Sequence, residues 1–228
     1  MKKNNLWIIP CCFLAVAAIV NFIGCGIDRT LASMVKPALL PLLTATTLAW
    51  LTCRTFDSRK AGLLVAAQLL GCAGDIFLIS DTFIPFACGM GSFLAGHVCY
   101  MCLFGGDSWK GLGWKTWVPS LIVMAALVAG LVAAIGIKGA LLGPMAVYGM
   151  GLMMLIFSGA AGLVRFGGKT WWLILCGALL FTFSDSLIAM GSFDVLPFKG
   201  RGVVIMVTYI AAQSLLAAGG IRLATQEK

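Results

Sequence analysis

Two aspartates stand inside apolar stretches that are long enough to cross a membrane. Asp75 lies in QLLGCAGDIFLIS and Asp185 lies in ALLFTFSDSLIAM. An ionisable side chain at the centre of a bilayer costs roughly 2.5–3.5 kcal/mol even on lenient scales, so its presence favours a functional role. Two carboxylates in a pocket of low dielectric can divide acid–base work, one donating a proton and the other stabilising a cation. The pair therefore predicts a catalytic site within the membrane.

The elements that position these aspartates must be membrane helices. Of the 228 residues, 61% are hydrophobic and 11% are charged, and the mean hydropathy is +1.03. Such a chain is far more apolar than a soluble domain. We therefore expect an all-α membrane protein in which residues 1–228 form one domain. Apolar windows of span length predict eight helices, near residues 6–24, 37–53, 61–80, 83–105, 117–137, 140–164, 171–190 and 203–223.

The net charge is +8, but the basic residues stand singly or in pairs and form no dense patch. We therefore expect no nucleic-acid partner, and we interpret these residues as signals of membrane topology. The two termini and the predicted loops 54–60, 106–116 and 165–170 carry 11 of the 16 Lys and Arg. The positive-inside rule then places both termini in the cytoplasm, and we expect a multi-pass protein of a bacterial inner membrane. The first apolar stretch is read as an uncleaved helix, not a signal peptide. The opposite side carries five basic residues: Arg29, Lys36, Lys138, Lys199 and Arg201.

The two aspartate segments resemble each other. Each has Leu-Leu six and five residues before the aspartate, a small residue just before it, and a phenylalanine eight residues after it. Four predicted helices separate them, which suggests two four-helix halves in parallel orientation. Each aspartate lies 14 residues after the start of its predicted helix. Both carboxylates are thus expected at one depth, some 20 Å from the cytoplasmic end.

Other polar side chains fall at a similar depth in neighbouring predicted helices. For each of these polar side chains alone, an interhelical hydrogen bond is the simplest interpretation. That interpretation suits the two aspartates less well, because only Lys36 is a nearby base. Lys36 is expected just before a helix that begins at Pro37, where it would either bind a phosphate or snorkel to the interface. Gln68 lies on the same face as Asp75. The candidate substrate-binding residues are Lys36, Asn21, Ser92, Tyr148, Ser184, Tyr209 and Gln213.

We expect neither a metal nor another cofactor. His97, Cys99 and Cys102 form the string H-x-C-x-x-C, but on a helix His97 and Cys99 point roughly 200° apart. No second pair of residues has the spacing to complete four ligands. The nine cysteines are interpreted as small packing residues. His97 keeps two interpretations, an interhelical hydrogen bond or a place on the floor of the pocket.

Five strings, in this order, resemble the YhhN-like lysoplasmalogenase family: KPALLPLL (36–43), GDIFL (74–78), GSFLAGHVCY (91–100), GALLFTFSDSLIA (177–189) and YIAAQSLLAAG (209–219). The resemblance implies an eight-helix membrane enzyme whose substrate is a lysophospholipid of the membrane. Such an enzyme hydrolyses the vinyl ether of lysoplasmalogens to a fatty aldehyde and glycerophosphocholine or glycerophosphoethanolamine. It also implies that Asp75 and Asp185 are the family's acidic pair, and that Lys36 and Pro37 are its Lys-Pro.

The chemistry of that reaction suits two carboxylates. An acid protonates the outer alkene carbon, an anion stabilises the oxocarbenium ion, and a positioned water attacks it, much as in glycosidases. The sequence leaves open which aspartate is the acid.

Two other classes of membrane protein remain as alternatives. One is an intramembrane aspartyl protease, although GCAGD lacks the G-x-G-D spacing and Pro-Ala-Leu precedes both acids. The other is a proton-coupled small-molecule carrier built of two halves.

Overall fold

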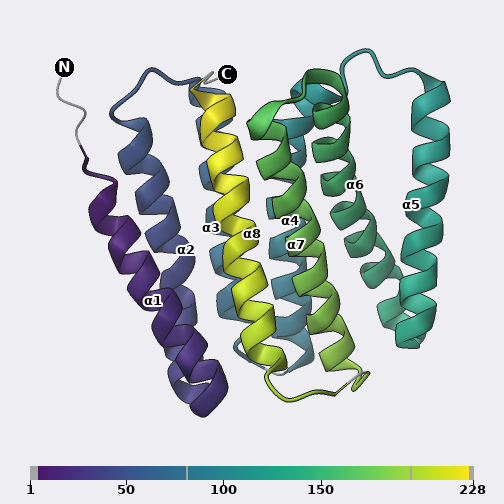
Figure 1. Cartoon of the computed structure of the whole chain (residues 1–228). Coiled ribbons are helices and arrows are strands. Elements are labelled where there is room, and N and C mark those ends of the chain that lie inside the picture. The colour runs from purple at the N-terminus through teal and green to yellow at the C-terminus, as the bar shows by residue number, and fades with distance from the viewer. Residues whose placement is uncertain (1–4, 81, 196, 226–228) are drawn as a thin grey trace.

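Eight long helices stand side by side in the computed structural model, which describes residues 5–80, 82–195 and 197–225 (Figure 1). All eight are long and apolar enough to cross a membrane, and the described residues contain no strand. A 3₁₀ turn at Gly139–Leu141 precedes the sixth helix. The helices are α1 (Ile8–Ile27), α2 (Arg29–Leu51), α3 (Ser58–Phe77), α4 (Phe83–Ser108), α5 (Trp114–Ile135), α6 (Leu142–Phe166), α7 (Gly168–Ser192) and α8 (Arg201–Ala224).

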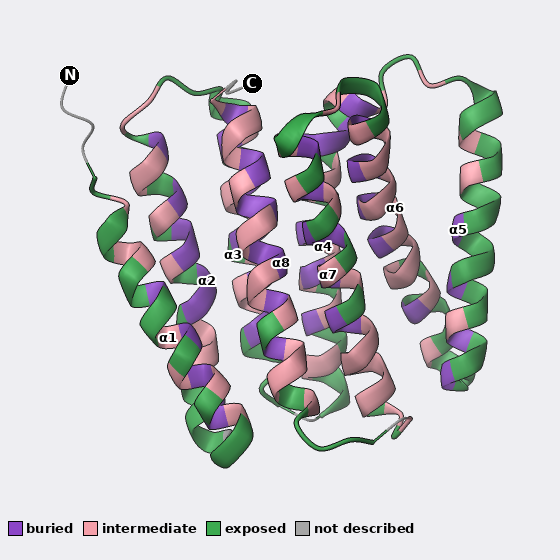
Figure 2. Cartoon of the chain, in the orientation of Figure 1, coloured by how far each residue is buried: buried purple, intermediate pink, exposed green. Residues whose placement is uncertain are grey.

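The distribution of apolar side chains is that of a protein in hydrocarbon. Large apolar residues lie on the outer faces of the helices, where Figure 2 shows exposed surface over much of α1, α5 and the ends of the bundle. Ile27, Met34, Ile84 and Val164 are each more than 70% exposed. In water, surface of this kind would aggregate, whereas lipid chains solvate it. The chain is therefore a multi-pass membrane protein. Polar residues lie inside, and those buried include Asn21, Gln68, Asp75, His97, Asp185 and Gln213.

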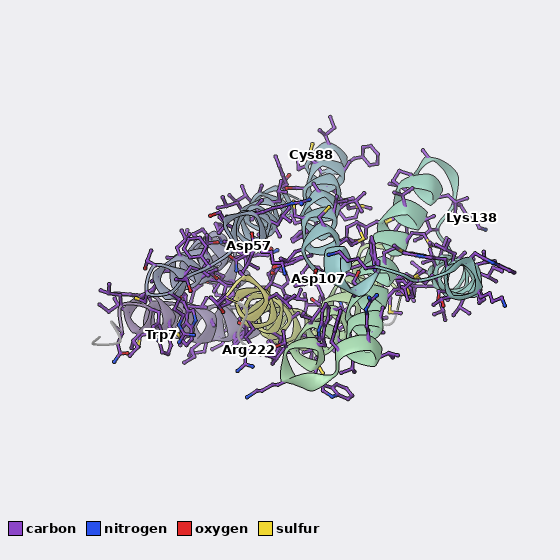
Figure 3. All side chains as sticks on the ribbon, turned by 90° about the horizontal axis from the view of Figure 1, so that it is seen from above. Trp7, Asp57, Cys88, Asp107, Lys138 and Arg222 are labelled. Atoms are coloured by element: carbon purple, nitrogen blue, oxygen red, sulfur yellow. The ribbon has the colours of Figure 1, made fainter. Side chains whose placement is uncertain are left out.

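The helices pack mainly as neighbours in sequence, with α8 near the centre. α8 packs against α7 and also contacts α1, α2 and α3, while α4 joins α3 to α6. α5 lies at the edge of the bundle, where its substantial contact is with α6 alone (Figure 1). The view from above shows the same order, with Lys138 far from Trp7 (Figure 3). The bundle is thus well closed on one side and open beside α5.

The second helix differs from the prediction at its start. α2 begins at Arg29, eight residues before the predicted Pro37, because Asp28 caps it by accepting a hydrogen bond from the Thr30 amide at 2.8 Å. The expectation that Lys36 precedes the helix was therefore wrong, since Lys36 lies within α2. The other seven helices begin and end within three residues of the predicted bounds.

Two prolines inside α2 free a backbone acceptor for α3. The carbonyl of Pro37 would bind the amide four residues later in a helix, but Pro41 has no N–H to donate. The Cys72 thiol of α3 donates to this carbonyl at 3.7 Å instead. This contact joins α2 to α3 close to the aspartate, because Cys72 lies one turn before Asp75 and Pro37 directly follows Lys36.

The two aspartates lie at equal distances along their helices. Asp75 lies 17 residues after Ser58, the first residue of α3, and Asp185 lies 17 residues after Gly168, the first residue of α7. At 1.5 Å per residue this is about 26 Å from the helix starts. The internal repeat of two four-helix halves stays a prediction.

Candidate active site

Asp75 is bound by two donors from other helices. The side chain is 1% exposed, and the Tyr209 hydroxyl of α8 donates to its Oδ2 at 2.8 Å. The ammonium of Lys36, from α2, lies 3.2 Å from Oδ1. A buried carboxylate that meets both a cation and a hydroxyl donor is stabilised in its ionised form. The placement of Lys36 inside α2 is what brings this cation to the carboxylate.

Asp185 has a different environment. The Tyr148 hydroxyl of α6 donates to its Oδ2. Within the described part of the chain no cation lies at ion-pair distance, although Asp185 is close enough to Asp75 and Lys36 for their charges to interact. The side chain is 8% exposed. The two carboxylates therefore form an asymmetric pair, one matched by a cation and the other held by a phenol alone.

An aromatic cluster connects the two tyrosines. The rings of Phe93 and Phe181 each lie edge-on to Tyr209, with centroids 6.1 and 5.6 Å away. The ring of His97 lies 4.8 Å from Phe181 and 5.5 Å from Tyr148. Such rings are stiff and apolar, so they fix both phenols and exclude water from beneath the carboxylates.

A glycine makes room for this cluster. A Cβ on Gly74 would lie 2.6 Å from the ring of Phe93, closer than any side chain tolerates. The residue before Asp75 must therefore be glycine for Phe93 to pack directly against α3. Sequence analysis noted only that a small residue precedes each aspartate, and the structure gives the reason for one of them.

Two adjoining hollows lie beside Asp185 and Lys36. The first, here called the apolar cleft, has a volume of about 70 Å³ and is walled by α4, α5, α6 and α7, with Asp185 and Tyr148 among its lining residues. The second, here called the vestibule, has a volume of about 550 Å³ and is lined by Lys36, Ser80 and Ser192 at the end of the bundle where α3 and α7 terminate. Leu78, Phe86 and Ile188 line both. The two hollows thus adjoin at these three residues, and the vestibule is the one that contains a cation and hydroxyl groups.

Several candidate binding residues join helices instead of facing these hollows. Ser92 donates to the Leu70 carbonyl at 2.7 Å, Ser184 to the Ile205 carbonyl at 3.0 Å, and Asn21 to the Ala32 carbonyl at 2.8 Å. Each bond crosses from one helix to another, as single polar residues in membrane helices commonly do. The bond of Asn21 joins α1 to α2.

Three more polar residues lie around Asp75 without touching it. Gln213 accepts a hydrogen bond from Tyr100 at 2.9 Å, and Gln68 donates to Thr47 at 3.0 Å. His97 is 1% exposed, and neither ring nitrogen has a hydrogen-bond partner among the described residues. The interhelical hydrogen bond expected as one interpretation of His97 is thus not formed there.

Sequence analysis missed the residues that shape the hollows. Phe86, Met90 and Phe93 of α4 and Val128 and Val132 of α5 line the apolar cleft, but in sequence they resemble any lipid-facing residue. Arg201 was counted only as a topology signal.

Comparison with known proteins defines the family. The model of the YhhN family matches residues 31–220, which include both aspartates, Lys36 and both tyrosines of the site. The chain belongs to the YhhN family.

Curated relatives of this YhhN protein carry an enzyme's name. Lysoplasmalogenase TMEM86B of Homo sapiens is 32% identical over 164 residues, which are 70% of this chain and 64% of that protein. Lysoplasmalogenase TMEM86B of Sus scrofa is 30% identical over 162 residues, which are 68% of this chain and 61% of that protein. The YhhN chain thus spans less than two thirds of the length of these relatives. No solved structure matches it.

Proposed function

We propose that this YhhN protein is a lysoplasmalogenase, which hydrolyses the vinyl ether of a lysophospholipid within the membrane. The observation that carries the proposal is the asymmetric carboxylate pair, in which Asp185 lines the apolar cleft and Asp75 is bound to Lys36, a residue that lines the vestibule. The names of the human and pig relatives support it.

The two hollows suit the two parts of such a substrate. A lysoplasmalogen has one alkenyl chain, a glycerol and a charged head group, with the vinyl ether at the boundary between chain and glycerol. We place the start of the chain in the apolar cleft and the head group in the vestibule. The reacting bond then lies beside Asp185 and Asp75, and the rest of the chain passes into lipid beside α5, the helix that packs substantially only on α6.

The surroundings of the carboxylates assign their roles. Asp75 is paired with Lys36 and bonded by Tyr209, so we assign it as the ionised partner. Asp185 meets no cation at ion-pair distance in the described residues and faces an apolar wall, so we assign it as the acid. Tyr148 binds Oδ2 of Asp185 and leaves its Oδ1 to carry the proton. Sequence analysis left this assignment open.

The reaction then proceeds in two stages. Asp185 transfers its proton to the outer alkene carbon, and the inner carbon and ether oxygen become an oxocarbenium ion that the Asp75 carboxylate stabilises. A water bound by the carboxylates adds to the inner carbon and returns a proton to Asp185. The resulting hemiacetal collapses to a fatty aldehyde and glycerophosphocholine or glycerophosphoethanolamine, whose glycerol oxygen keeps the hemiacetal proton, so one water is consumed for each bond broken.

The same geometry disfavours the alternative of an aspartyl protease. A protease dyad shares one proton between two equivalent carboxylates. Here Lys36 is bound to Asp75 only, and each carboxylate has its own tyrosine. The arrangement is that of two separate roles.

The test is aldehyde release by the purified protein from a lysoplasmalogen in detergent, without metal, nucleotide or ion gradient. Asp75→Asn and Asp185→Asn should each reduce turnover by about 100-fold or more, because an amide neither donates the proton nor carries the charge. Asp107→Asn is the matched control, since Asp107 is ion-paired with Lys60 at the other end of the bundle, where α4 ends and α3 begins. Normal turnover by either active-site variant would exclude the two-carboxylate mechanism.

A further inference from the structure

One cation beside the vestibule lacks a partner. Arg201 is the first residue of α8, and its Nη1 is buried without a hydrogen-bond partner in the described part of the chain. It forms no ion pair there either. A buried donor without an acceptor costs free energy, and more so when the group is charged. Arg201 itself is half-buried, and an anionic ligand beside it would accept from this free donor.

The guanidinium lies against the last turn of α7. A Cβ on Gly191 would come within 3.0 Å of its Cζ and 3.1 Å of its Nη2, so a glycine leaves the room that the guanidinium occupies. Ile188, which lies one turn before Gly191 on the same face of α7, lines the vestibule, and so does the next residue, Ser192. Ile205, one turn after Arg201 on α8, lines it as well. Arg201 therefore borders the vestibule where α7 meets α8.

The other cation of the vestibule already has a counter-ion. Lys36 lines the vestibule, but its charge is matched by Asp75. An anion in the vestibule would thus find the charge of Lys36 already matched, whereas that of Arg201 has no counter-ion among the described residues.

We propose that Arg201 binds the phosphate of the lysophospholipid head group in the vestibule, and thereby makes the enzyme selective for phosphate-bearing vinyl-ether lipids. The inference rests on the proposed function. A guanidinium presents two parallel N–H donors that match two phosphate oxygens, which an ammonium cannot do. Phosphate bound at the α7–α8 wall would anchor the glycerol so that the vinyl ether lies at the inner end of the vestibule, beside the carboxylates.

Two substrates with the same alkenyl chain test the proposal in detergent: a lysoplasmalogen, and an alkenylglycerol that lacks the phosphate. Arg201→Gln should raise KM for the lysoplasmalogen about tenfold or more and leave KM for the alkenylglycerol within about twofold. Arg201→Lys should recover part of the loss. Lys199→Gln, which removes an exposed cation two residues away, should change neither KM. Equal effects of Arg201→Gln on both substrates, or no effect on either, would overturn the proposal.

A binding measurement separates this inference from the proposed function. The probe is lysophosphatidylcholine, which has the phosphate but no vinyl ether, titrated into the purified wild-type protein and the Arg201→Gln variant. Binding that weakens in the variant supports the phosphate site even where no vinyl ether is hydrolysed, and in that case the proposed function alone fails. If the lysoplasmalogen is hydrolysed but the wild-type protein and the variant bind lysophosphatidylcholine equally well, the phosphate site is contradicted and the proposed function is not. Inorganic phosphate is titrated as a further probe. If the wild-type protein binds inorganic phosphate but Arg201→Gln does not change lysophosphatidylcholine binding, the site is one for free phosphate and the lipid assignment is rejected.

Discussion

The ammonium of Lys36 lies 3.2 Å from a carboxylate oxygen of Asp75, so the basic residue of the vestibule is bound to one acid of the catalytic pair. No comparable cation reaches Asp185 among the described residues. This difference is what divides the proposed roles of the two aspartates, and it changes the effect expected from substitutions of Lys36.

Lys36→Met should lower kcat by about 100-fold, because the ionised state of Asp75 loses the charge that stabilises it in a buried position. A residue that only held the phosphate would raise KM and leave kcat nearly unchanged. The measurement is steady-state aldehyde release across lysoplasmalogen concentrations. Lys138→Met, which removes an exposed cation near the same end of the bundle, is the control and should behave as wild type. A change in KM alone would mean that the ion pair has no catalytic role.

The three tyrosines of the chain offer a matched set of substitutions. Tyr148→Phe and Tyr209→Phe each remove one hydrogen bond to a carboxylate, which should lower kcat by roughly 10- to 100-fold. Tyr100→Phe removes a hydroxyl that is buried like that of Tyr209 but is bonded to Gln213 instead. It should reduce thermal stability and leave kcat within about threefold. If all three variants lost activity to the same extent, the loss would reflect packing and not contact with the carboxylates.

The apolar cleft should limit the shape of the chain near the vinyl ether. Gly149 lines the cleft, and a Cβ there would lie 3.0 Å from Val128 of α5. Gly149→Leu should therefore fill the cleft and raise KM for lysoplasmalogens about tenfold. Gly130→Leu is the control, because a Cβ on Gly130 meets no atom within 4 Å. An unchanged KM in Gly149→Leu would place the chain elsewhere.

The topology predicted from the basic residues places the vestibule on the non-cytoplasmic side. In a protein without native cysteines, Ser80→Cys and Ser192→Cys, both in the vestibule wall, should react with an impermeant maleimide added outside intact cells. Ser58→Cys and Lys169→Cys, which are exposed at the other end of the bundle, should not react until the cells are opened. The inverse pattern would move the proposed site to the cytoplasmic leaflet.

The helices could be predicted from sequence because the bilayer imposes a length and a composition on each one. The start of α2 could not, since Pro37 has the sequence character of a first helical residue while the actual cap, Asp28, lies eight residues earlier. Lys36 was therefore expected at the end of a helix, whereas in the structure it lies within α2 and contacts Asp75. Counting residues did predict that the two aspartates lie equally far along their helices, although each lies 17 residues and not 14 after the helix start.

The partners of the aspartates required the structure. Tyr148 and Tyr209 were candidates along with Ser92, Ser184 and Asn21, and depth alone does not separate a residue that faces a carboxylate from one that faces a backbone carbonyl. The direction of a side chain depends on helix rotation, and membrane helices without a strong polar face give little information about it. For the same reason Arg201 was recognised only once its guanidinium was seen against Gly191.

Hydrolysis in D₂O tests the central claim most directly. The purified protein is given a lysoplasmalogen in deuterated buffer, the aldehyde is trapped as it forms, and its mass is measured. If an acid that exchanges with solvent protonates the outer alkene carbon, the carbon next to the aldehyde should carry one deuterium. The Asp185→Asn variant should form neither the aldehyde nor the labelled carbon. An aldehyde without deuterium, or a labelled product formed at the wild-type rate by Asp185→Asn, would contradict the proposed role of Asp185.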